Sequence, residues 1–494
     1  MTNQRLSTEE RAFFRTVYHA AFANPFSDLR QKLDSKIAGL FPGVSRRESV
    51  DRCIKEVGAR IRRLENEGRS TINAFTGQDK TLITTVVLFD EFHKFRDRFD
   101  QLIVDQIAAG DESLPVPFAE EAMGRLRQWG FPEDRLLHYF SLSYQLRRAF
   151  FFISHSLVGR SGCMKELRRK LWDNVFTHNI DLYDRFLWNR MEDFSTLLLG
   201  ETGTGKGTAA MAIGRSGFIP FDRKKGCFAE SFAQAFISLN LSQFPETLLE
   251  SELFGHRKGA FTGAVDDYPG VFERCSSFGS ILLDEIGEVP NHVQIKLLQV
   301  LQDRVFSPVG SHVKSRFKGR VIAATNRSVD DILEGRVFRD DFYYRLCSDI
   351  IEVPPLRERI QQDPSELDDL LDFTVRRMTG TTSEEFTRKV RRVIDRQLGK
   401  DYHWPGNVRE LEQCVRRVLL RRSYEGEKRR GPQGLDQELL QGMAAGDINA
   451  ADLVSKYCDL LYTRHGSYEE VARRTGLDRR TVKKYIAQQS GAKE

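Results

Sequence analysis

A glycine-rich loop that contains a lysine lies near the middle of the chain, at residues 200–208. Its residues are Gly200, Glu201, Thr202, Gly203, Thr204, Gly205, Lys206, Gly207 and Thr208. Glycines let backbone N–H groups converge on phosphate oxygens, and a lysine at the start of a helix can reach the β- and γ-phosphates of a nucleotide. The loop therefore predicts a nucleotide-phosphate site, with an ordinary glycine-rich turn as the alternative.

Two adjacent carboxylates supply the acidic chemistry that such a loop needs. Gly207 stands where most phosphate loops carry a hydroxyl that binds Mg²⁺, so we expect the metal to depend on acids elsewhere. Asp284 and Glu285 follow the apolar run 280–283. Asp284 can hold Mg²⁺, through water, and Glu285 can polarise the water that attacks the γ-phosphate. Two ordinary surface acids after a strand are the alternative interpretation.

Four further polar side chains are candidates for nucleotide contacts. The amide of Asn326 follows another apolar run and can sense the γ-phosphate. Arg339 and Arg345 lie in a short polar-aromatic stretch, from which arginines of a ring-forming ATPase reach the neighbouring subunit's nucleotide. Arg409 falls in the first turn of an expected helix, where a cation opposes the helix dipole unless an anion is near. Solvated surface arginines are the plainer alternative for all three.

A parallel sheet is the element that can bring these side chains together. The apolar runs 196–199, 236–240, 279–283 and 320–325 each predict a buried strand, and a helix is expected to begin at the phosphate loop. Polar residues that end parallel strands meet at one edge of the sheet. We therefore predict an α/β phosphate-loop ATPase core with a helical lid.

The regions on either side of this core are expected to be helical. Residues 1–156 carry apolar side chains at helical spacing, which predicts an all-α regulatory or oligomerisation region. Asp90 and His93 have the i, i+3 spacing of carboxylate-bridged metal bundles, although a solvated helix face explains them as well. Residues 424–450 are interpreted as a linker.

The last part of the chain, residues 451–494, predicts a helix-turn-helix with a basic final helix. Its side chains can contact phosphates and base edges of double-stranded DNA, and a small helical bundle with a solvated basic face is the alternative. The candidate DNA-binding residues are Arg473, Arg474, Arg479, Arg480, Thr481, Lys483 and Lys484.

Composition limits the remaining possibilities. With 494 residues the chain should hold several domains, and a net charge of +5 is too small to imply nucleic-acid binding except by a local patch. Seven dispersed cysteines are typical of reduced thiols. There is no signal-peptide pattern and no apolar run of membrane-spanning length, so we expect a cytoplasmic protein without a membrane contact.

Residues from about 157 to 423 resemble the AAA+ domain of bacterial enhancer-binding proteins, the activators of sigma-54 RNA polymerase. The segment 250–256 and the hexapeptide after it match the signature loop of this family without a substitution. The hexapeptide is Gly259, Ala260, Phe261, Thr262, Gly263 and Ala264. Segments 284–288, 338–339, 344–346, 354–359 and 404–411 also match, and 451–494 resembles the Fis-type helix-turn-helix of the family.

The resemblance implies roles for these residues. It makes Lys206 a phosphate ligand, Asn240 the residue that couples Glu285 to the nucleotide state, and Arg409 a second sensor. Arg339 and Arg345 become fingers supplied in trans, and the hexapeptide becomes the contact to the sigma factor. The implied cofactors are ATP and Mg²⁺. The implied partners are sigma-54 RNA polymerase, an upstream double-stranded DNA site and further copies of the chain in a ring expected to be hexameric.

Two departures from the family keep alternatives open. Gly207 replaces the glutamate that usually follows the loop lysine, so ATP turnover could be altered, and the segment 208–236 is longer and more basic than usual. A DNA-binding regulator with an impaired ATPase is therefore one alternative. An AAA+ remodeller that acts on some other protein is another. The N-terminal region resembles no phosphoacceptor or ligand-sensing domain, so its signal is not predicted.

Overall fold

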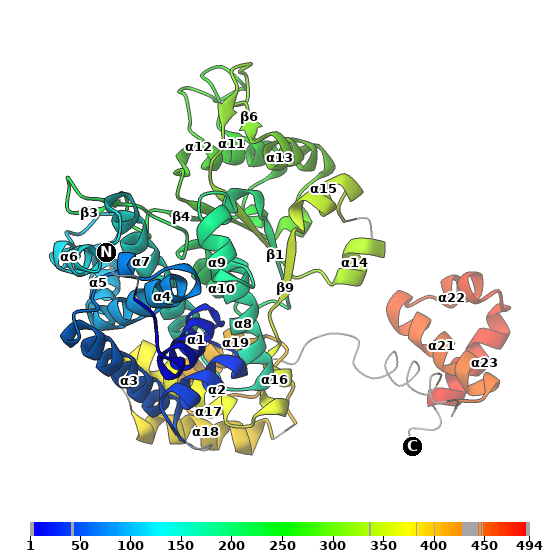
Figure 1. Cartoon of the computed structure of the whole chain (residues 1–494). Helices are drawn as coiled ribbons and strands as arrows, with labels where there is room; N and C mark the ends of the chain where they lie inside the picture. Colours follow the sequence, from blue (N-terminus) through cyan, green and yellow to red (C-terminus); the bar gives the residue numbers. More distant parts are fainter. Residues whose placement is uncertain are drawn as a thin grey trace. The chain divides into compact units, whose positions relative to one another are not determined.

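The computed structural model describes residues 4–40, 44–334, 337–381, 383–399, 401–426, 443, 446 and 448–490. It forms two compact units, Met1–Tyr424 and Glu425–Glu494, each of which is described by itself (Figure 1). Most of the predicted linker, including residues 427–442, lies outside the described residues. Among the described helices, none is long and apolar enough to span a membrane.

The centre of the first unit is a five-stranded parallel sheet with the order β4-β5-β8-β1-β9. Its strands are β1 (Thr196–Leu199), β4 (Phe236–Asn240), β5 (Ser280–Asp284), β8 (Arg320–Thr325) and β9 (Asp349–Glu352). The four strands predicted from apolar runs are all present. The edge strand β9 was not predicted, because it contains only two apolar residues, Ile350 and Ile351, between two exposed carboxylates.

Helices and two short hairpins cover the sheet. The helices of this part are α10 (Lys206–Gly214), α11 (Glu246–Phe254), α12 (Val271–Arg274), α13 (Asn291–Asp303), α14 (Val329–Glu334) and α15 (Asp340–Leu346). The hairpins are β2 (Phe221–Asp222) with β3 (Cys227–Phe228), and β6 (Val305–Phe306) with β7 (Ser315–Arg316). A helical lid follows, with α16 (Leu356–Gln362), α17 (Glu366–Thr379), α18 (Glu384–Gln397) and α19 (Asn407–Arg421).

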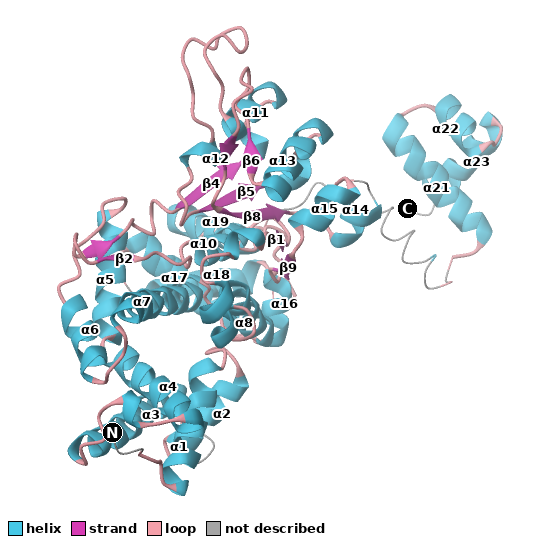
Figure 2. Ribbon diagram, turned by 45° about the horizontal axis from the view of Figure 1, so that its top comes forward, coloured by secondary structure: helices cyan, strands magenta, loops and turns pink. Residues whose placement is uncertain are grey.

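The N-terminal region is helical, as predicted, and it packs directly on the sheet-bearing part (Figures 1 and 2). Its helices are α1 (Thr8–Phe22), α2 (Asp28–Ile37), α3 (Arg46–Asn66), α4 (Gly77–Lys94), α5 (Arg96–Ala109), α6 (Ala119–Gln128), α7 (Glu133–Ser156) and α8 (Gly162–Phe176). One hydrophobic core joins these helices to one face of the sheet, including Leu198 of β1 and Ile322 of β8. The opposite face, with Leu197 and Leu283, belongs to a second core under α11 and α13. Alternate side chains of each strand therefore pack into different hydrophobic cores.

Helix α7 is the main contact between the N-terminal helices and the phosphate-loop helix α10. The buried Arg148 donates hydrogen bonds to the carbonyl oxygens of Arg215 (2.8 Å) and Gly217 (2.6 Å), just after α10 ends. Gln145 donates to the carbonyl oxygen of Ser216 at 2.9 Å. Carbonyl groups at a helix C-terminus have no partner within the helix, so α7 satisfies the end of α10.

The unusual segment between α10 and β4 packs against the same helix. The N–H of Phe221 donates to the hydroxyl of Ser141 on α7 (3.0 Å), and the ring of Phe228 stacks on Tyr144 with centroids 4.0 Å apart. The guanidinium of Arg223 pairs with Glu120 at 2.7 Å. This segment, which is longer and more basic than usual in the family, therefore packs against the N-terminal helices.

The second unit contains three described helices around a small core. They are α21 (Ala450–His465), α22 (Tyr468–Thr475) and α23 (Arg479–Ser490). Val471 of α22 and Val482 of α23 are fully buried together with Cys458 of α21. The two helices of the predicted helix-turn-helix are thus present, and Gly476 at φ 69° makes the turn after α22. Their use in DNA binding stays a prediction.

Candidate nucleotide-binding site

The phosphate loop joins the buried strand β1 to α10 in the predicted order. Gly205, at φ 107°, precedes the first helical residue, and Gly203 has φ 81°. A Cβ added to Gly203 would lie 2.3 Å from the carbonyl oxygen of Gly406, so only glycine fits under the lid there. The first N–H groups of α10 have no carbonyl partner within the helix and carry its positive dipole end. This geometry suits a bound phosphate.

Lys206 lies inside the loop. Its side chain is buried, and its Nζ donates to the carbonyl oxygens of Gly200 (2.8 Å) and Glu201 (3.3 Å). Burial lowers the pKa of this ammonium, while Glu285 and Asp284 oppose the shift. The lysine is therefore held at the loop beside two carboxylates.

The two predicted carboxylates lie at the same edge of the sheet as the loop. Asp284 ends β5, and its Oδ1 accepts a hydrogen bond from the N–H of Glu285 at 3.0 Å. Glu285 has φ 57° and ψ 43°, a left-handed conformation that costs energy for a residue with a Cβ. Such strain is concentrated at functional sites, which agrees with the catalytic role predicted for Glu285.

A cavity of about 340 Å³ brings most of the predicted nucleotide residues together. Residues 202–208, Asp284, Glu285 and Arg409 all line it. Asn326 lies at the edge of the loop, because its Nδ2 is 3.4 Å from the hydroxyl of Thr202.

Asn240 adjoins this cavity through the sheet. It pairs with Asp284 across β4 and β5, and its Oδ1 accepts from the N–H (3.0 Å) and the hydroxyl (2.8 Å) of Ser242. Its side chain is therefore engaged away from Glu285 in this structure.

The two predicted finger arginines lie outside the cavity of their own chain. Arg339 pairs with Asp341 at 2.9 Å, and its side chain is 42% exposed. The Nε of Arg345 donates to the carbonyl oxygen of Leu301 at 2.9 Å. Neither lines the cavity, which is the placement that action on a neighbouring subunit requires.

Asn407 is a site residue that the sequence indicated only as part of the matching segment 404–411. Its Nδ2 donates to the Oε2 of Glu201 and to the carbonyl oxygen of Thr202, both at 3.1 Å. Its Oδ1 accepts from the N–H of Leu356 at 2.8 Å. The N–H of Val408 donates to the carbonyl oxygen of Gly203 at 3.0 Å. The lid is therefore bonded to the phosphate loop; the motif at 404–407 was the available signal.

The apolar wall of the cavity was also missed. It is formed by Leu157, Val158, Met164, Leu167, Val353 and Leu370. These residues come from the segment before β1, the end of the sheet and the lid, so no local pattern unites them. An apolar wall beside a polar loop suits the base of a nucleotide.

Gly207 leaves open space in the second position of α10. An added Cβ there would meet no atom within 4 Å. The glycine is therefore not required by packing, and a longer side chain would fit.

The predicted sigma-contact loop projects from the sheet-bearing part with the segment that carries β6 (Figure 2). The N–H of Gly259 donates to the carbonyl oxygen of Ala264 at 2.8 Å, which closes the loop. Phe261 is 37% exposed, and its ring meets His256 edge-on at 4.9 Å. Phe261 thus packs partly on its own domain and still offers an exposed apolar surface.

The candidate DNA-binding residues differ in whether their positive charge is paired with a carboxylate. Glu470 pairs with Arg473 (2.6 Å) and Arg474 (2.7 Å), which lower the pKa of that carboxyl to about 2. Arg479 pairs with Glu469 at 2.7 Å. The other cations of the set, Arg480, Lys483 and Lys484, are exposed without an ion pair to a carboxylate among the described residues. The carboxylate of Asp478 caps α23 by accepting from the N–H groups of Arg480 (2.9 Å) and Thr481 (3.1 Å), and it also accepts from the hydroxyl of Thr481.

The considered metal pair is not supported. Asp90 pairs with Lys94 at 2.5 Å, and the Nδ1 of His93 bonds to the carbonyl oxygen of Phe89 at 2.8 Å. Within the described residues no group of three or more His, Cys, Asp or Glu side chains is arranged so that it could hold a metal ion.

Comparison with known proteins places this geometry in a family. Residues 179–352, which carry the phosphate loop, both carboxylates and the projecting loop, match the family described as the sigma-54 interaction domain. The chain therefore contains a sigma-54 interaction domain and is similar to sigma-54-dependent transcriptional activators. The AAA+ core predicted from the sequence, a parallel sheet with a helical lid behind a helical N-terminal region, is thereby confirmed.

Relatives of this family align with only part of the chain. The Nif-specific regulatory protein of Azotobacter vinelandii is 42% identical over 233 residues, which are 47% of this chain and 40% of that protein. The nitrogen fixation protein AnfA of the same organism is 37% identical over 58% of this chain and 51% of its own. The transcriptional regulator NtrC of Azospirillum brasilense is 36% identical over 54% and 49%. The chain thus spans about half the length of these relatives.

Proposed function

We propose that this chain is a sigma-54-dependent activator that hydrolyses ATP in a homo-oligomeric ring, expected to be hexameric, and remodels sigma-54 RNA polymerase from an upstream DNA site. The observation that carries the proposal is the cavity in which Lys206, Asp284 and Glu285 of the sigma-54 interaction domain meet Arg409 of the lid. The residues fit the nucleotide: a glycine-rich loop that opens a helix, a buried lysine and an apolar wall.

Each polar group of the cavity has one task in this proposal. Lys206 and the first N–H groups of α10 bind the phosphates. Asp284 is the carboxylate that would hold Mg²⁺, which supplies charge neutralisation at the transferred phosphoryl group. Glu285 orients and polarises the attacking water, and Asn326 senses the γ-phosphate. Asn240 links Glu285 to the nucleotide state by exchanging its present bonds to Ser242.

Ring assembly completes the site in trans. Arg339 and Arg345 approach the γ-phosphate of the adjacent subunit and neutralise charge in its transition state. In support, the side chain of Arg339 is half-exposed, and its guanidinium pairs with Asp341 of its own chain in an exposed ion pair of small stability. A stronger phosphate contact can replace that pair.

In this proposal the projecting loop 259–264 is the part of the ATPase that acts on the partner protein. It contains no acid, base or cation and so contributes nothing to phosphoryl transfer. Phe261, exposed at its tip, is an apolar anchor of the kind that dominates small interfaces, and we assign it to the sigma factor. The helices α22 and α23 hold the protein at double-stranded DNA through their exposed cations.

The decisive experiment is Glu285→Gln, with Glu273→Gln on the surface of α12 as the matched control. We expect near-normal ATP binding and a loss of hydrolysis on the order of 10²-fold, the scale of removing a general base. Transcription from a sigma-54 promoter should be lost in parallel, while the control stays active. Unchanged turnover in Glu285→Gln would refute the assignment.

An impaired ATPase that acts only as a DNA-binding regulator is the second candidate. The observation in its favour is Gly207, which leaves the second position of α10 without a side chain. ATP binding without turnover, at concentrations where rings are present, would support this candidate over the first.

A further inference from the structure

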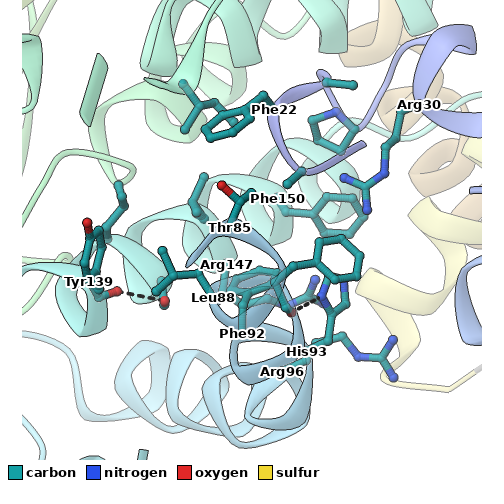
Figure 3. Close-up of a pocket in the computed structure, with 18 of the residues that line it drawn as sticks. Phe22, Arg30, Thr85, Leu88, Phe92, His93, Arg96, Tyr139, Arg147 and Phe150 are labelled. Atoms are coloured by element: carbon teal, nitrogen blue, oxygen red, sulfur yellow. Dashed lines mark hydrogen bonds between the residues drawn. The ribbon is translucent and has the colours of Figure 1, made fainter. Parts of the chain in front are cut away.

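A second cavity, of about 1130 Å³, lies among the N-terminal helices, apart from the nucleotide site (Figure 3). Its walls come from α1, α2, α3, α4, α5, α7 and α8, and from residues between 180 and 185. The cavity is partly open to solvent, since exposed side chains such as Arg46, Arg47 and Lys80 also line it, so a ligand can enter. A space of this size is in the range of small-molecule sites and larger than the nucleotide cavity.

The walls of this cavity are aromatic. Phe22 of α1, Phe92 of α4 and both Tyr139 and Phe150 of α7 turn toward one space in Figure 3. Trp172 of α8 also lines it. Flat aromatic side chains on several sides favour a flat aromatic occupant, through stacked and edge-on contacts.

The charges that line the cavity are unbalanced. Every aspartate of the lining has an arginine partner, in the pairs Arg30–Asp34, Arg96–Asp51, Arg96–Asp97, Arg147–Asp100, Arg185–Asp181 and Arg135–Asp184. Arg46, Arg47 and Lys80 also line it, and among the described residues none of the three has a carboxylate partner. Unpaired cations beside an apolar space favour an anionic group on the occupant.

His93 adds a hydrogen-bonding group to the wall of the cavity, and its pKa reflects the positive charges nearby. Burial and the nearby guanidinium groups of Arg30, Arg96 and Arg147 lower its pKa to about 3, so the ring is neutral at physiological pH. Its Nδ1 must carry the proton, because it bonds to the carbonyl oxygen of Phe89. The Nε2 is left as a hydrogen-bond acceptor on a side chain that lines the cavity.

Helix α7 connects the cavity to the phosphate-loop helix. Tyr139, Leu146 and Phe150 lie on the face that lines the cavity. Gln145 and Arg148, on the other face, bond to the carbonyl groups that end α10. An occupant that shifts α7 must therefore strain or relax contacts at the end of α10, whose other end is the phosphate loop.

We propose that this cavity binds a small aromatic anion, and that occupancy changes the nucleotide site through α7. The binding site stands independently of the proposed ATPase, whereas the coupling rests on it. Ligand binding is measured first without nucleotide, so that a failure of the coupling can be distinguished from a failure of the binding site.

The binding test uses the full chain and the fluorescent probe 1-anilinonaphthalene-8-sulfonate, an aromatic anion. N-phenyl-1-naphthylamine, the same ring system without the sulfonate, is the neutral counterpart. We expect one saturable site that binds the sulfonate more tightly. Weak, non-saturable binding, or a preference for the neutral probe, would overturn the proposal. Decanoate tests an aliphatic occupant: displacement of the probe as effective as that by 2-naphthoate would overturn the aromatic assignment.

Two substitutions locate the site. Thr85→Phe places a ring in the cavity and should weaken probe binding at least about tenfold, since it removes the space that the probe fills. Thr16→Phe is its matched control, because Thr16 makes the same hydroxyl bond to the carbonyl four residues earlier but does not line the cavity. Lys80→Gln should weaken the sulfonate about two- to fivefold, the effect of one exposed ion pair, and leave the neutral probe unchanged. Lys32→Gln on α2 is the control for charge. Equal effects of test and control variants would refute the location.

The coupling is measured as the change in probe affinity when ADP saturates the nucleotide site. Linkage requires ADP affinity to change by the same factor when the probe saturates the cavity, and we expect about fivefold or more. An unchanged affinity in both directions would refute the route through α7. If the chain bound no ADP, the proposed function and the coupling would fail, while the probe experiments would still decide the site.

Discussion

Asn407 joins the lid to the phosphate loop, and replacing it with alanine is a direct test of that connection. The amide is fully buried and makes three hydrogen bonds, to Leu356, Thr202 and Glu201. It also has φ 53°, a left-handed conformation that asparagine tolerates better than alanine does.

The size of the effect follows from these contacts. Asn407→Ala leaves the buried N–H of Leu356 without an acceptor, at a cost of about 1–3 kcal/mol. The bond to the carbonyl oxygen of Thr202 contributes about 1 kcal/mol. The bond to Glu201 is discounted, because that carboxylate is 42% exposed and remains paired with Arg357. Left-handed alanine adds about 1 kcal/mol. The lid should therefore be held less tightly by about 3–5 kcal/mol, and by about 2–4 kcal/mol in Asn407→Gly, which avoids the conformational cost.

Hydrogen exchange measured by mass spectrometry reads this change locally. Peptides that cover 404–410 and 200–206 should exchange about 10²-fold faster or more in Asn407→Ala, since each 1.4 kcal/mol is a factor of ten. Peptides from 452–462 serve as the internal reference, and Asn291→Ala, an exposed asparagine at the start of α13, is the matched control. ADP affinity should fall together with lid protection.

Unchanged exchange in both peptides would show that the lid is held by other contacts. A uniform increase across the chain would show that Asn407 supports general stability rather than the junction. A smaller effect in Asn407→Gly than in Asn407→Ala would confirm the contribution of the left-handed backbone.

The remaining predictions concern turnover, assembly and output. Gly207→Glu should raise the thermal unfolding temperature slightly, because glycine is about 1 kcal/mol poorer than other residues in a helix and the space is open; a lower temperature would reveal a hidden packing role. Mixtures of Arg339→Ala and Lys206→Ala subunits should recover some ATPase activity, because mixed rings contain intact interfaces; no recovery after subunit exchange would exclude action in trans. Lys484→Ala should weaken DNA binding for all sequences and reduce its salt dependence by about one unit of slope, measured by titration at several salt concentrations; an unchanged slope would remove that phosphate contact. Phe261→Ala should leave ATPase activity and assembly intact and abolish capture of the sigma factor; a parallel loss of hydrolysis would mean that the loop is structural.

The sequence by itself determined the chemistry of the site and the strands that carry it. The phosphate loop, Asp284 and Asn326 each follow an apolar run, so their places at one edge of a parallel sheet could be predicted from linear patterns. The hexapeptide 259–264 and the basic final helix could be found in the same way, because each is contiguous in the chain. Such patterns can be recognised without knowledge of the fold, because all of their residues are neighbours in the sequence.

Only the tertiary structure decided the contacts between residues far apart in the chain. Asn407 and Glu201 are separated by 206 positions, and nothing in either neighbourhood indicates that the two side chains bond. The edge strand β9 has no apolar run, since one side of an edge strand is exposed. The cavity lined by Phe22, Phe92 and Phe150 needs three helices to pack imperfectly against one another. In the sequence these rings have the helical spacing that rings in a filled core would also have. Periodicity shows which face of a helix is apolar, but it does not show whether that face packs against other side chains or lines a cavity.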